Sequence, residues 1–511
     1  MYSHILCGTV LGVEGVDINV EVDVSNGLPM FEMVGYLGSE VKEARERVRT
    51  ALKNSGFSLP AKRITVNLSP ANIHKAGTAF DLAIALAILI TIEDIPGDFF
   101  KDCIVIGELG LNGEVRPVNG ILPMLSSANE KGITKALIPL DNVYEGGVVT
   151  GMTVYGATDL ANVVRLIRGE DSDIVPFHQD VNTLFNEQKV DGPDFASVAG
   201  QAFTKRALEI AAAGFHNILM VGPPGAGKSM LAKCLPSILP PLTLKESIEI
   251  TKIYSVKGLL KEGQALITTR PFRSPHHTLS SRALTGGGSN PLPGEMSLAH
   301  NAVLFLDELP EFSRESLEVM RQPLEDKKVT ISRVSASYTF PADFMLVAAM
   351  NPCPCGYYPD RKKCRCSDGQ IRKYLGRISQ PMLDRIDMCV ETKAVSYREL
   401  RSKAKEEPSE VIRERVINAI NIQKERYKNI GICFNSQLEA KQIDEYCPLK
   451  NREEEFLMTA VDQYNLSARA LHRILKVSRT IADMKEHDRI LEDDLAEALM
   501  FHNGNLKFWN E

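Results

Sequence analysis

Hydrophobic and polar positions alternate with different periods along the chain. Residues 16–24 (VDINVEVDV) alternate with a period of two, which is typical of a half-buried strand. Residues 39–57 carry apolar positions at helical spacing, with Ser39 expected at the N-cap and Gly56 near the C-terminal end. The apolar run from Leu82 to Ile92 predicts a buried helix that is too short to cross a bilayer. The first third of the chain therefore predicts a mixture of strands and helices.

The pattern changes twice further along the chain. Between residues 191 and 395, short apolar runs alternate with helical segments, which predicts a parallel sheet covered by helices. Beyond that point strand patterns disappear, and apolar residues such as Ile412 and Val416 recur at helical spacing. The segment before the sheet is acidic and aperiodic, as linkers are. We therefore predict an α/β multidomain protein with an α+β domain at residues 1–167, a linker at 168–190, a parallel α/β core at 191–395 and a helical domain at 396–511.

Composition and charge exclude some classes of protein. The 511 residues are 44% hydrophobic and 24% charged, as in a globular protein with a substantial core. The net charge of −6 gives no overall basic field, so any contact with nucleic acid must come from local patches. The N-terminus lacks a secretory pattern, and ten cysteines without an export signal indicate reduced thiols or metal ligands. We expect a cytoplasmic protein without membrane contact.

A phosphate-binding motif follows the first apolar run of the core. The stretch HNILMVGPPGAGKSML contains G-x-x-x-x-G-K-[ST] between a strand pattern and a helix pattern, which argues against a chance glycine-rich turn. Glycines let backbone N–H groups surround phosphate oxygens, Lys228 would reach the β- and γ-phosphates, and Ser229 would hold Mg²⁺. The expected ATP-binding residues are Gly222, Pro223, Pro224, Gly225, Ala226, Gly227, Lys228 and Ser229.

Two further apolar runs end in polar residues. Asp307 and Glu308 follow NAVLFL, where Asp307 would hold Mg²⁺ through water and Glu308 would deprotonate the attacking water. Asn351 follows FMLVAAM, and its amide would hydrogen-bond the γ-phosphate or that water. Alone, an acidic pair or an asparagine after a strand is often an ordinary loop residue. Their order downstream of a phosphate loop favours a catalytic role.

These motifs in this order resemble those of the AAA+ ATPases, where they are called Walker A, Walker B and sensor 1. The segment RPFRSPHHTLSSRALTGGGSNPLPGEMSLAHNAVLFLDELPEF resembles the magnesium-chelatase-like branch of that class. The whole chain is similar to the YifB/ComM family within the branch. The resemblance implies an AAA+ core with a helical lid, acting as a homo-oligomeric, hexameric ring that uses ATP and Mg²⁺.

The resemblance also points to arginines outside these motifs. Arg385 in QPMLDRIDM matches the segment whose arginine completes a neighbouring subunit's site, and Arg377 is the second candidate. A guanidinium suits this role because it is permanently charged and binds phosphate in bidentate fashion. A surface arginine paired with an adjacent aspartate is the alternative. In NLSARALHRIL, Ser467 is expected to cap a helix, Arg469 matches the sensor 2 position, and Arg473 is its alternative.

Four cysteines stand as two C-x-C pairs in NPCPCGYYPDRKKCRC, namely Cys353, Cys355, Cys364 and Cys366. In extended backbone, residues i and i+2 point to the same side, so each pair can present two sulfurs together. The intervening loop can bring the pairs into a tetrahedral S₄ site suited to structural Zn²⁺. Reduced cysteines in a turn, or a disulfide pair, remain alternatives.

The N-terminal part resembles the domain found in Lon-type proteases, through NLSPANIHKAGTAFDLAIALAIL and GELGLNGEVRPVNGILPM. Those enzymes use a serine activated by a lysine. Alignment on Gly77 leaves Thr78 and Ala79 at the serine position, and Leu122 stands where the lysine is expected. We therefore expect a non-proteolytic module that contacts a protein partner or DNA. The residues that remain for other chemistry are His74, Lys75 and Thr78.

The family resemblance implies a motor on branched or single-stranded DNA that promotes branch migration during recombination and natural transformation. A chelatase-type motor acting on a protein partner and an ATP-dependent protease are the alternatives. The Lon-like domain argues against the chelatase-type motor, and the missing Ser/Lys pair argues against the protease. Residues 360–377 hold seven Lys/Arg against two Asp, although a solvated face would also explain this run. Candidate pore elements are residues 284–295 and residues 327–344, the latter with Lys327, Lys328 and Arg333.

Overall fold

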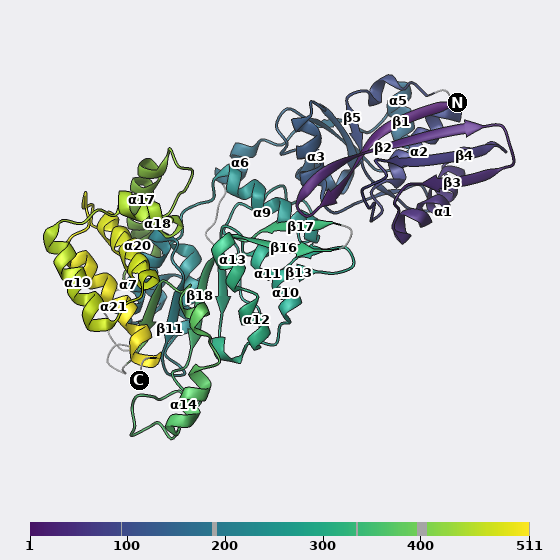
Figure 1. Ribbon diagram of the computed structural model, residues 1–511. Coiled ribbons are helices and arrows are strands. Elements are labelled where there is room, and N and C mark those ends of the chain that lie inside the picture. Colours follow the sequence, from purple (N-terminus) through teal and green to yellow (C-terminus); the bar gives the residue numbers. More distant parts are fainter. Residues whose placement is uncertain (93–94, 187–191, 334–335, 396–405, 510–511) are drawn as a thin grey trace.

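The computed structural model describes residues 1–92, 95–186, 192–333, 336–395 and 406–509. An N-terminal lobe of strands and helices lies at one end, a parallel sheet lies in the middle, and the C-terminal helices lie at the other end (Figure 1). The expected mixed α/β architecture with a helical C-terminal region is confirmed. The expected domain boundaries near residues 190 and 395 fall at segments outside the described residues.

Within the described residues, eight strands of the N-terminal lobe form one sheet in the order β10-β9-β8-β5-β1-β2-β4-β3. β1 and β2 pair antiparallel along their whole length, from Tyr2 opposite Asp23 to Leu11 opposite Glu14. The expected alternation in β2 is present, because Ile18, Val20 and Val22 are buried. The strands span Tyr2–Leu11 (β1), Glu14–Ser25 (β2), Met30–Val34 (β3), Arg63–Ser69 (β4), Cys103–Val105 (β5), Lys135–Pro139 (β8), Thr153–Ala157 (β9) and Pro176–Phe177 (β10).

Helices α1 (Ser39–Asn54), α2 (Asp81–Ile92) and α3 (Ile121–Glu130) pack on this sheet. α2 is the expected buried helix, with its interior apolar positions fully enclosed. The expected cap of α1 was wrong, since Ser39 is its first helical residue and Gly38 takes the N-cap without a side-chain bond. No helix in the described ranges combines the length and the apolar character that a membrane span requires.

Regular structure continues into the segment expected to be a linker. β10 pairs antiparallel with β9 and so adds an edge strand to the N-terminal sheet. The Phe177 ring of β10 packs edge-on against Tyr144, with ring centroids 5.3 Å apart. The short helix α6 (Val181–Asn186) follows. The N-terminal lobe therefore extends past residue 167.

In the described part of the core, five parallel strands form a sheet in the order β12-β15-β18-β11-β19. β11 and β15 are buried at every position, as expected for strands covered on both faces. β18 pairs with β11 on one side and β15 on the other. The loops after these three strands therefore leave the same edge of the sheet. The strands span Ile218–Val221 (β11), Phe272–Arg273 (β12), Val303–Leu306 (β15), Met345–Met350 (β18) and Met388–Glu391 (β19).

The C-terminal helices share a core with one face of this sheet. Ile412 and Val416 of α17 lie in the same apolar cluster as Ile218 of β11 and Ile474 of α20. The lid is therefore packed directly onto the α/β core. The helices that build this region and flank the sheet are α7 (Ala202–Gly214), α8 (Lys228–Cys234), α9 (Leu244–Lys257), α17 (Ser409–Tyr427), α18 (Ala440–Tyr446), α19 (Asn451–Tyr464), α20 (Ala468–Met484) and α21 (Glu492–Trp509).

Two small hairpins project from the core toward the N-terminal lobe (Figure 1). β13 (Gly286–Gly287) pairs with β14 (Leu292–Pro293), and β16 (Lys328–Ser332) pairs with β17 (Ser337–Pro341). They lie within the two candidate pore elements, residues 284–295 and 327–344. Phe340 and Tyr338 of β17 pack with Val13 of the N-terminal lobe and Ile253 of α9. The N-terminal lobe thus packs against strand β17 of the second hairpin.

A buried charge cluster organises the lid. The Asp483 carboxylate accepts hydrogen bonds from Arg479 Nε at 3.0 Å, from Arg426 Nη1 at 2.9 Å and from Asn435 Nδ2 at 2.9 Å. Arg479 and Asp483 are both almost fully buried. Because a buried charge without a partner is costly, each arginine depends on this carboxylate.

We predict that Asp483→Ala destabilises the lid by about 3–5 kcal/mol, because it leaves Arg479 buried and unpaired. Hydrogen exchange of the α20 amides measures this loss locally, which suits a chain with several lobes. The exposed Asp493 of α21 provides the matched control, Asp493→Ala. Equal protection of α20 in both variants would contradict the prediction.

Candidate functional site

The loop after β11 has the geometry of a phosphate cradle. Gly222 N–H donates to the Met350 carbonyl at 3.2 Å, and a Cβ on Gly222 would collide with the Thr392 carbonyl oxygen. Gly225 and Gly227 have φ values of +76° and +85°, which favour glycine. The loop borders a cavity of about 390 Å³ at the carboxyl edge of the sheet. Its lining residues are Pro224, Gly225, Ala226, Gly227, Lys228, Ser229, Met230, Asp307, Glu308, Met350 and Asn351.

The Lys228 side chain is folded back onto this loop. Its Nζ donates to the carbonyl oxygens of Gly222 at 2.7 Å and Pro223 at 3.0 Å, and to Asn351 Oδ1 at 3.1 Å. Burial lowers the pKa of the Lys228 ammonium, while the charge of Asp307 acts in the opposite direction. The structure therefore brings the expected lysine and the expected asparagine together, because β18 lies next to β11.

Ser229 and Asp307 meet across the same cavity. Ser229 Oγ donates to Asp307 Oδ2 at 2.5 Å. A hydroxyl oxygen and a carboxylate that converge on one position are the hard oxygen ligands that Mg²⁺ prefers. These two residues fit the expected magnesium site.

Glu308 lines the cavity in a left-handed backbone conformation, with φ of 52°. Its backbone N–H donates to Asp307 Oδ1 at 2.9 Å, and its side chain is 58% exposed. His277 Nδ1 lies 3.3 Å from Glu308 Oε2. His277 belongs to the segment RPFRSPHH, and no local sequence pattern marks it as a neighbour of Glu308.

The two candidate finger arginines are bonded within their own chain. Arg385 is 11% exposed and pairs with Glu325 at 2.7 Å, and its Nε donates to the Arg321 carbonyl at 2.8 Å. Its acidic partner is therefore Glu325 and not an adjacent aspartate. Arg377 is 49% exposed and pairs with Glu311 at 2.8 Å, just beyond the acidic motif.

The sensor 2 candidates differ in their surroundings. Ser467 Oγ caps α20 by accepting from Ala470 N–H, as expected. Arg469 is exposed and makes no ion pair with any residue that the structure describes. Arg473 is buried, and its Nη1 donates to the carbonyl oxygens of Leu383 at 2.8 Å and Ile386 at 2.6 Å. Arg473 is thus engaged inside the chain, and Arg469 is the arginine exposed to solvent.

A second cavity, of about 490 Å³, adjoins the phosphate loop, and the sequence analysis missed it. Gln201 lines this cavity and donates through Nε2 to the Ala226 carbonyl at 3.1 Å, which links it to the loop. The stretch VAGQ in the sequence was the available sign of this cavity. In the structure its Gly200 and Gln201 both have positive φ. Apolar walls with a few polar groups suit a nucleotide base. The lining residues are Gln201, Ala202, Phe203, Thr204, Glu391, Lys393, Ala394, Val395 and Met500.

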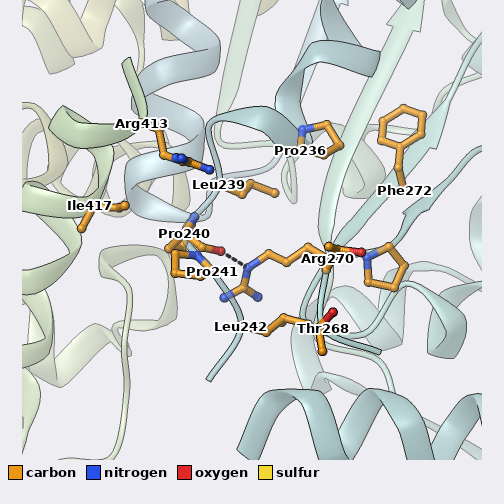
Figure 2. Close-up of a pocket in the computed structure, with 12 residues that line it drawn as sticks. Pro236, Leu239, Pro240, Pro241, Leu242, Thr268, Arg270, Phe272, Arg413 and Ile417 are labelled. Carbon is orange, nitrogen blue, oxygen red and sulfur yellow. Dashed lines mark hydrogen bonds between the residues drawn. The ribbon is translucent and has the colours of Figure 1, made fainter. Parts of the chain in front are cut away.

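A third cavity, also of about 490 Å³, lies where α17 meets the core (Figure 2). Arg413 and Ile417 of α17 face a proline-rich loop across it. Arg270 lines this cavity, and its guanidinium already has partners within the chain. It donates hydrogen bonds to the Pro240 carbonyl at 2.8 Å and to Glu246 at 2.9 Å. This cavity shares no lining residue with the phosphate cavity and is therefore separate from the nucleotide site.

The four cysteines of the C-x-C pairs form one cluster. Their sulfur atoms all lie within 4.8 Å of one another, and they belong to Cys353, Cys355, Cys364 and Cys366. Three of the Sγ–Sγ distances are 3.4, 3.7 and 3.6 Å. A tetrahedral zinc site with Zn–S bonds of about 2.3 Å needs sulfur separations of about 3.8 Å. All four are free thiols, so the structure does not contain the disulfide alternative.

The cysteine loop packs against the phosphate loop. Gly356 has φ of +85°, and a Cβ there would collide with the Pro224 ring. The Tyr357 backbone N–H lowers the pKa of the Cys355 thiol to about 6, so this sulfur is readily a thiolate. The cluster is therefore in direct contact with the loop expected to bind phosphate.

The N-terminal site aligned with Lon-type proteases contains other contacts. The Thr78 hydroxyl donates to Glu108, while the buried Lys75 amine donates to the Pro70 carbonyl. Leu122 is buried in the lobe core. The lysine nearest in sequence to Thr78 thus points elsewhere. A cavity of about 390 Å³ beside Thr78 is lined by His74, Glu108, Lys257 and Asn290, among others, and so borders both the lobe and the core.

Comparisons with known proteins agree with these observations. Residues 194–400 match the family model described as magnesium chelatase, subunit ChlI. Residues 20–142 match a model described as subunit ChlI of Mg-chelatase, and residues 406–502 match one described as magnesium chelatase, subunit ChlI C-terminal. The chain is 27% identical over 148 residues, 28% of its length, to Lon protease 2 of Bacillus subtilis, of which these cover 26%.

Several relatives match over almost the whole length. The chain is 43% identical to competence protein ComM of Haemophilus influenzae, with 96% of this chain and 95% of that protein covered. It is 40% identical to YifB of Escherichia coli with the same coverage. The chain therefore belongs to the YifB/ComM family of magnesium-chelatase-like AAA+ proteins.

Proposed function

We propose that the chain is a Mg²⁺-dependent ATPase that forms a hexameric ring and drives branch migration of DNA, as a helicase in recombination and natural transformation. The observation that carries the ATPase part is the meeting of Lys228, Asn351 and Asp307 at one edge of the sheet, with Glu308 beside them. The family supports the AAA+ ATPase, and the relative named a competence protein supports the link to DNA uptake.

In this proposal each residue has one task. Lys228 and the loop N–H groups bind the phosphates, and Asn351 donates its amide to the γ-phosphate or the water. Mg²⁺, held by Ser229 and Asp307, would neutralise charge on the phosphates. Glu308 takes a proton from the water that attacks the γ-phosphorus. The base of the nucleotide occupies the cavity beside Gln201.

Arginines from the ring would complete each site. We assign the trans role to Arg385, with Arg377 as the second candidate, and the cis role at the lid to Arg469. Glu325 neutralises Arg385 in the isolated chain, so the finger must exchange a carboxylate for phosphate when the ring forms. Arg469 needs no such exchange, because it is exposed and unpaired among the described residues.

DNA contact is assigned to the hairpins and the basic segment. Lys328 and Arg333 are exposed, and Arg333 Nη2 donates to the Gly288 carbonyl at 2.8 Å, which joins the two hairpins. Lys327 pairs with Asp343 at 3.1 Å and contributes less free charge. All seven basic residues of 360–377 are exposed. Such clustered charge can neutralise phosphates.

The N-terminal lobe is proposed as a Lon-like, non-proteolytic module for a protein partner or DNA. Its Thr78 bonds Glu108 and its buried Lys75 bonds a backbone carbonyl, so neither forms a Ser/Lys-type pair with the other. A chelatase-type motor would instead require stimulation by a protein partner. Cleavage of casein that is lost in Thr78→Ala would favour the protease.

We also propose that the cysteine cluster holds a structural Zn²⁺. The four sulfurs leave no open position for substrate, so the metal would stiffen the loop and do no chemistry. Its contact with Pro224 through Gly356 makes the metal a support of the phosphate loop.

Separate variants test binding and hydrolysis of ATP. Lys228→Ala is expected to lose nucleotide binding, because it removes the charge that holds the phosphates. Glu308→Gln is expected to bind ATP normally and to lose about 10²–10⁴-fold in turnover, because an amide is no base. Fluorescent nucleotide titration and phosphate release measure the two effects. The exposed Glu414 supplies the control Glu414→Gln. Parental turnover in both site variants would refute the assignment of ATP hydrolysis to this cavity.

For DNA, the double variant Lys328→Ala/Arg333→Ala is expected to weaken binding to forked and four-way DNA. It should reduce the slope of log affinity against log salt by about 0.7 for each lost contact with single strands. Strand displacement should fall in parallel. A control that removes two exposed lysines of the lid, Lys441→Ala/Lys450→Ala, should leave both unchanged. Absence of binding by the parent protein at low salt would overturn the DNA assignment.

Metal analysis tests the zinc site. The purified protein should carry about one zinc per chain, and Cys353→Ser/Cys364→Ser should carry none. Because the loop supports Pro224, this variant should also bind nucleotide more weakly. Cys433 is exposed and lies outside the cluster, so Cys433→Ser is the control. A parent protein purified without chelator that contains no metal would rule out the proposal.

A further inference from the structure

The cavity between α17 and the core contains an arginine without a partner. Figure 2 shows the Arg413 side chain reaching from α17 toward Leu239 of the proline-rich loop. Arg413 is half-buried, and its guanidinium makes no hydrogen bond or ion pair with any residue that the structure describes. A charged group that is partly removed from water and unpaired favours an anion beside it.

Other side chains on the same helix show the contrast. Arg415, two residues further along α17, bonds Glu209 at 2.6 Å and Glu407 at 2.6 Å. Glu410 stands one turn before Arg413, at a spacing that permits an ion pair, yet it is exposed and forms none with Arg413. Among the described residues, α17 thus supplies Arg413 to the cavity as a free charge.

The polar lining of the cavity suits an anion with a single negative charge. Arg270 is the second charged residue in the lining, and its charge is already compensated by Glu246 at 2.9 Å. Only the charge of Arg413 is left without a counter-ion in the part of the chain that the structure describes. The hydroxyls of Thr268 and Thr269 also line the cavity and can add hydrogen bonds to a bound anion.

The proline-rich wall limits the kind of anion that can bind. Proline has no backbone N–H, so this wall offers few donors to a ligand. A phosphate group is typically held by several N–H donors, as at a helix N-terminus, whereas one guanidinium can hold a carboxylate in bidentate fashion. The lining therefore favours a carboxylate over a phosphate. The prolines of the lining are Pro236, Pro240, Pro241 and Pro271.

The remaining walls are apolar and held in place. Leu239 and Leu242 are buried, and the Phe272 ring is stacked on Phe305 with centroids 5.7 Å apart. Arg270 holds the loop through the Pro240 carbonyl at 2.8 Å. A cavity of about 490 Å³ is within the size range of small-molecule sites, which are mostly apolar with a few placed polar groups. The ligand should therefore carry an apolar body as well as its carboxylate.

We propose that this cavity binds a small monocarboxylate, whose carboxylate pairs with Arg413 and whose apolar body packs against Leu239, Phe272 and Ile417. Arg413 and Ile417 belong to the lid, and the other lining residues belong to the core, so the ligand bridges these two parts of the chain. The site shares no lining residue with the phosphate cavity. The inference goes beyond the proposed ATPase function and does not rest on it.

The test titrates phenylbutyrate and its amide into the full chain without nucleotide, with binding followed by ligand-observed NMR. Phenylbutyrate should bind with a Kd on the order of 1 mM, and the amide about tenfold more weakly, because it lacks the charge-assisted bond. Arg413→Gln should lower the affinity for phenylbutyrate to that for the amide, and Arg413→Lys should keep part of the difference. Arg49 of α1 is exposed and unpaired among the described residues, so Arg49→Gln is the matched control.

Hydrogen exchange locates the bound probe. Phenylbutyrate should slow exchange of the α17 amides in the parent and not in Arg413→Gln. Ile417→Trp, which fills the cavity, should weaken binding of both probes. The inference is overturned by no binding of phenylbutyrate at millimolar concentration, by equal affinity for acid and amide, or by parental binding in Arg413→Gln. Slowed exchange at the phosphate loop in place of α17 would also contradict it. Because binding is measured without ATP, a parent protein that does not hydrolyse ATP contradicts only the proposed function.

Discussion

The pairing of β18 with both β11 and β15 is the constraint on which the rest of the site depends. Its register places Val221 opposite Met350 and Leu306 opposite Ala348, so the three strands end together. Lys228, Asp307 and Asn351 then meet although they are far apart in sequence. A shift of β18 by one residue would turn Asn351 to the other face of the sheet. Burial of both faces fixes the register against such a shift.

This constraint explains which parts of the site were predictable. Buried parallel strands read as apolar runs, and side chains that follow them gather at one edge, so the residues after β11, β15 and β18 could be assigned from sequence. His277 could not, because only the pairing of β12 with β15 brings its loop to Glu308. No local sequence pattern shows that the loop after β12 lies beside Glu308.

The sequence also did not predict which of the candidate arginines are free to bind a ligand. Arg469 and Arg473 lie one turn apart on the same face of α20, so the sequence does not distinguish them. In the structure Arg473 is buried and donates hydrogen bonds to the carbonyl oxygens of Leu383 and Ile386. Arg385 bonds Glu325, which is remote in sequence, and not its neighbours. Helical periodicity gives the face of a residue, but tertiary contacts decide whether its charge is free.

Both hairpins are inserted between strands of the core sheet. The first hairpin is inserted between β12 and β15, and the second between β15 and β18, so each adjoins β15, the strand that leads into Asp307 and Glu308. The N-terminal lobe packs against β17 of the second hairpin through Val13. The cysteine loop braces the phosphate loop at Pro224. The hairpins and the cysteine loop are therefore attached to the same close-packed sheet that carries the phosphate loop.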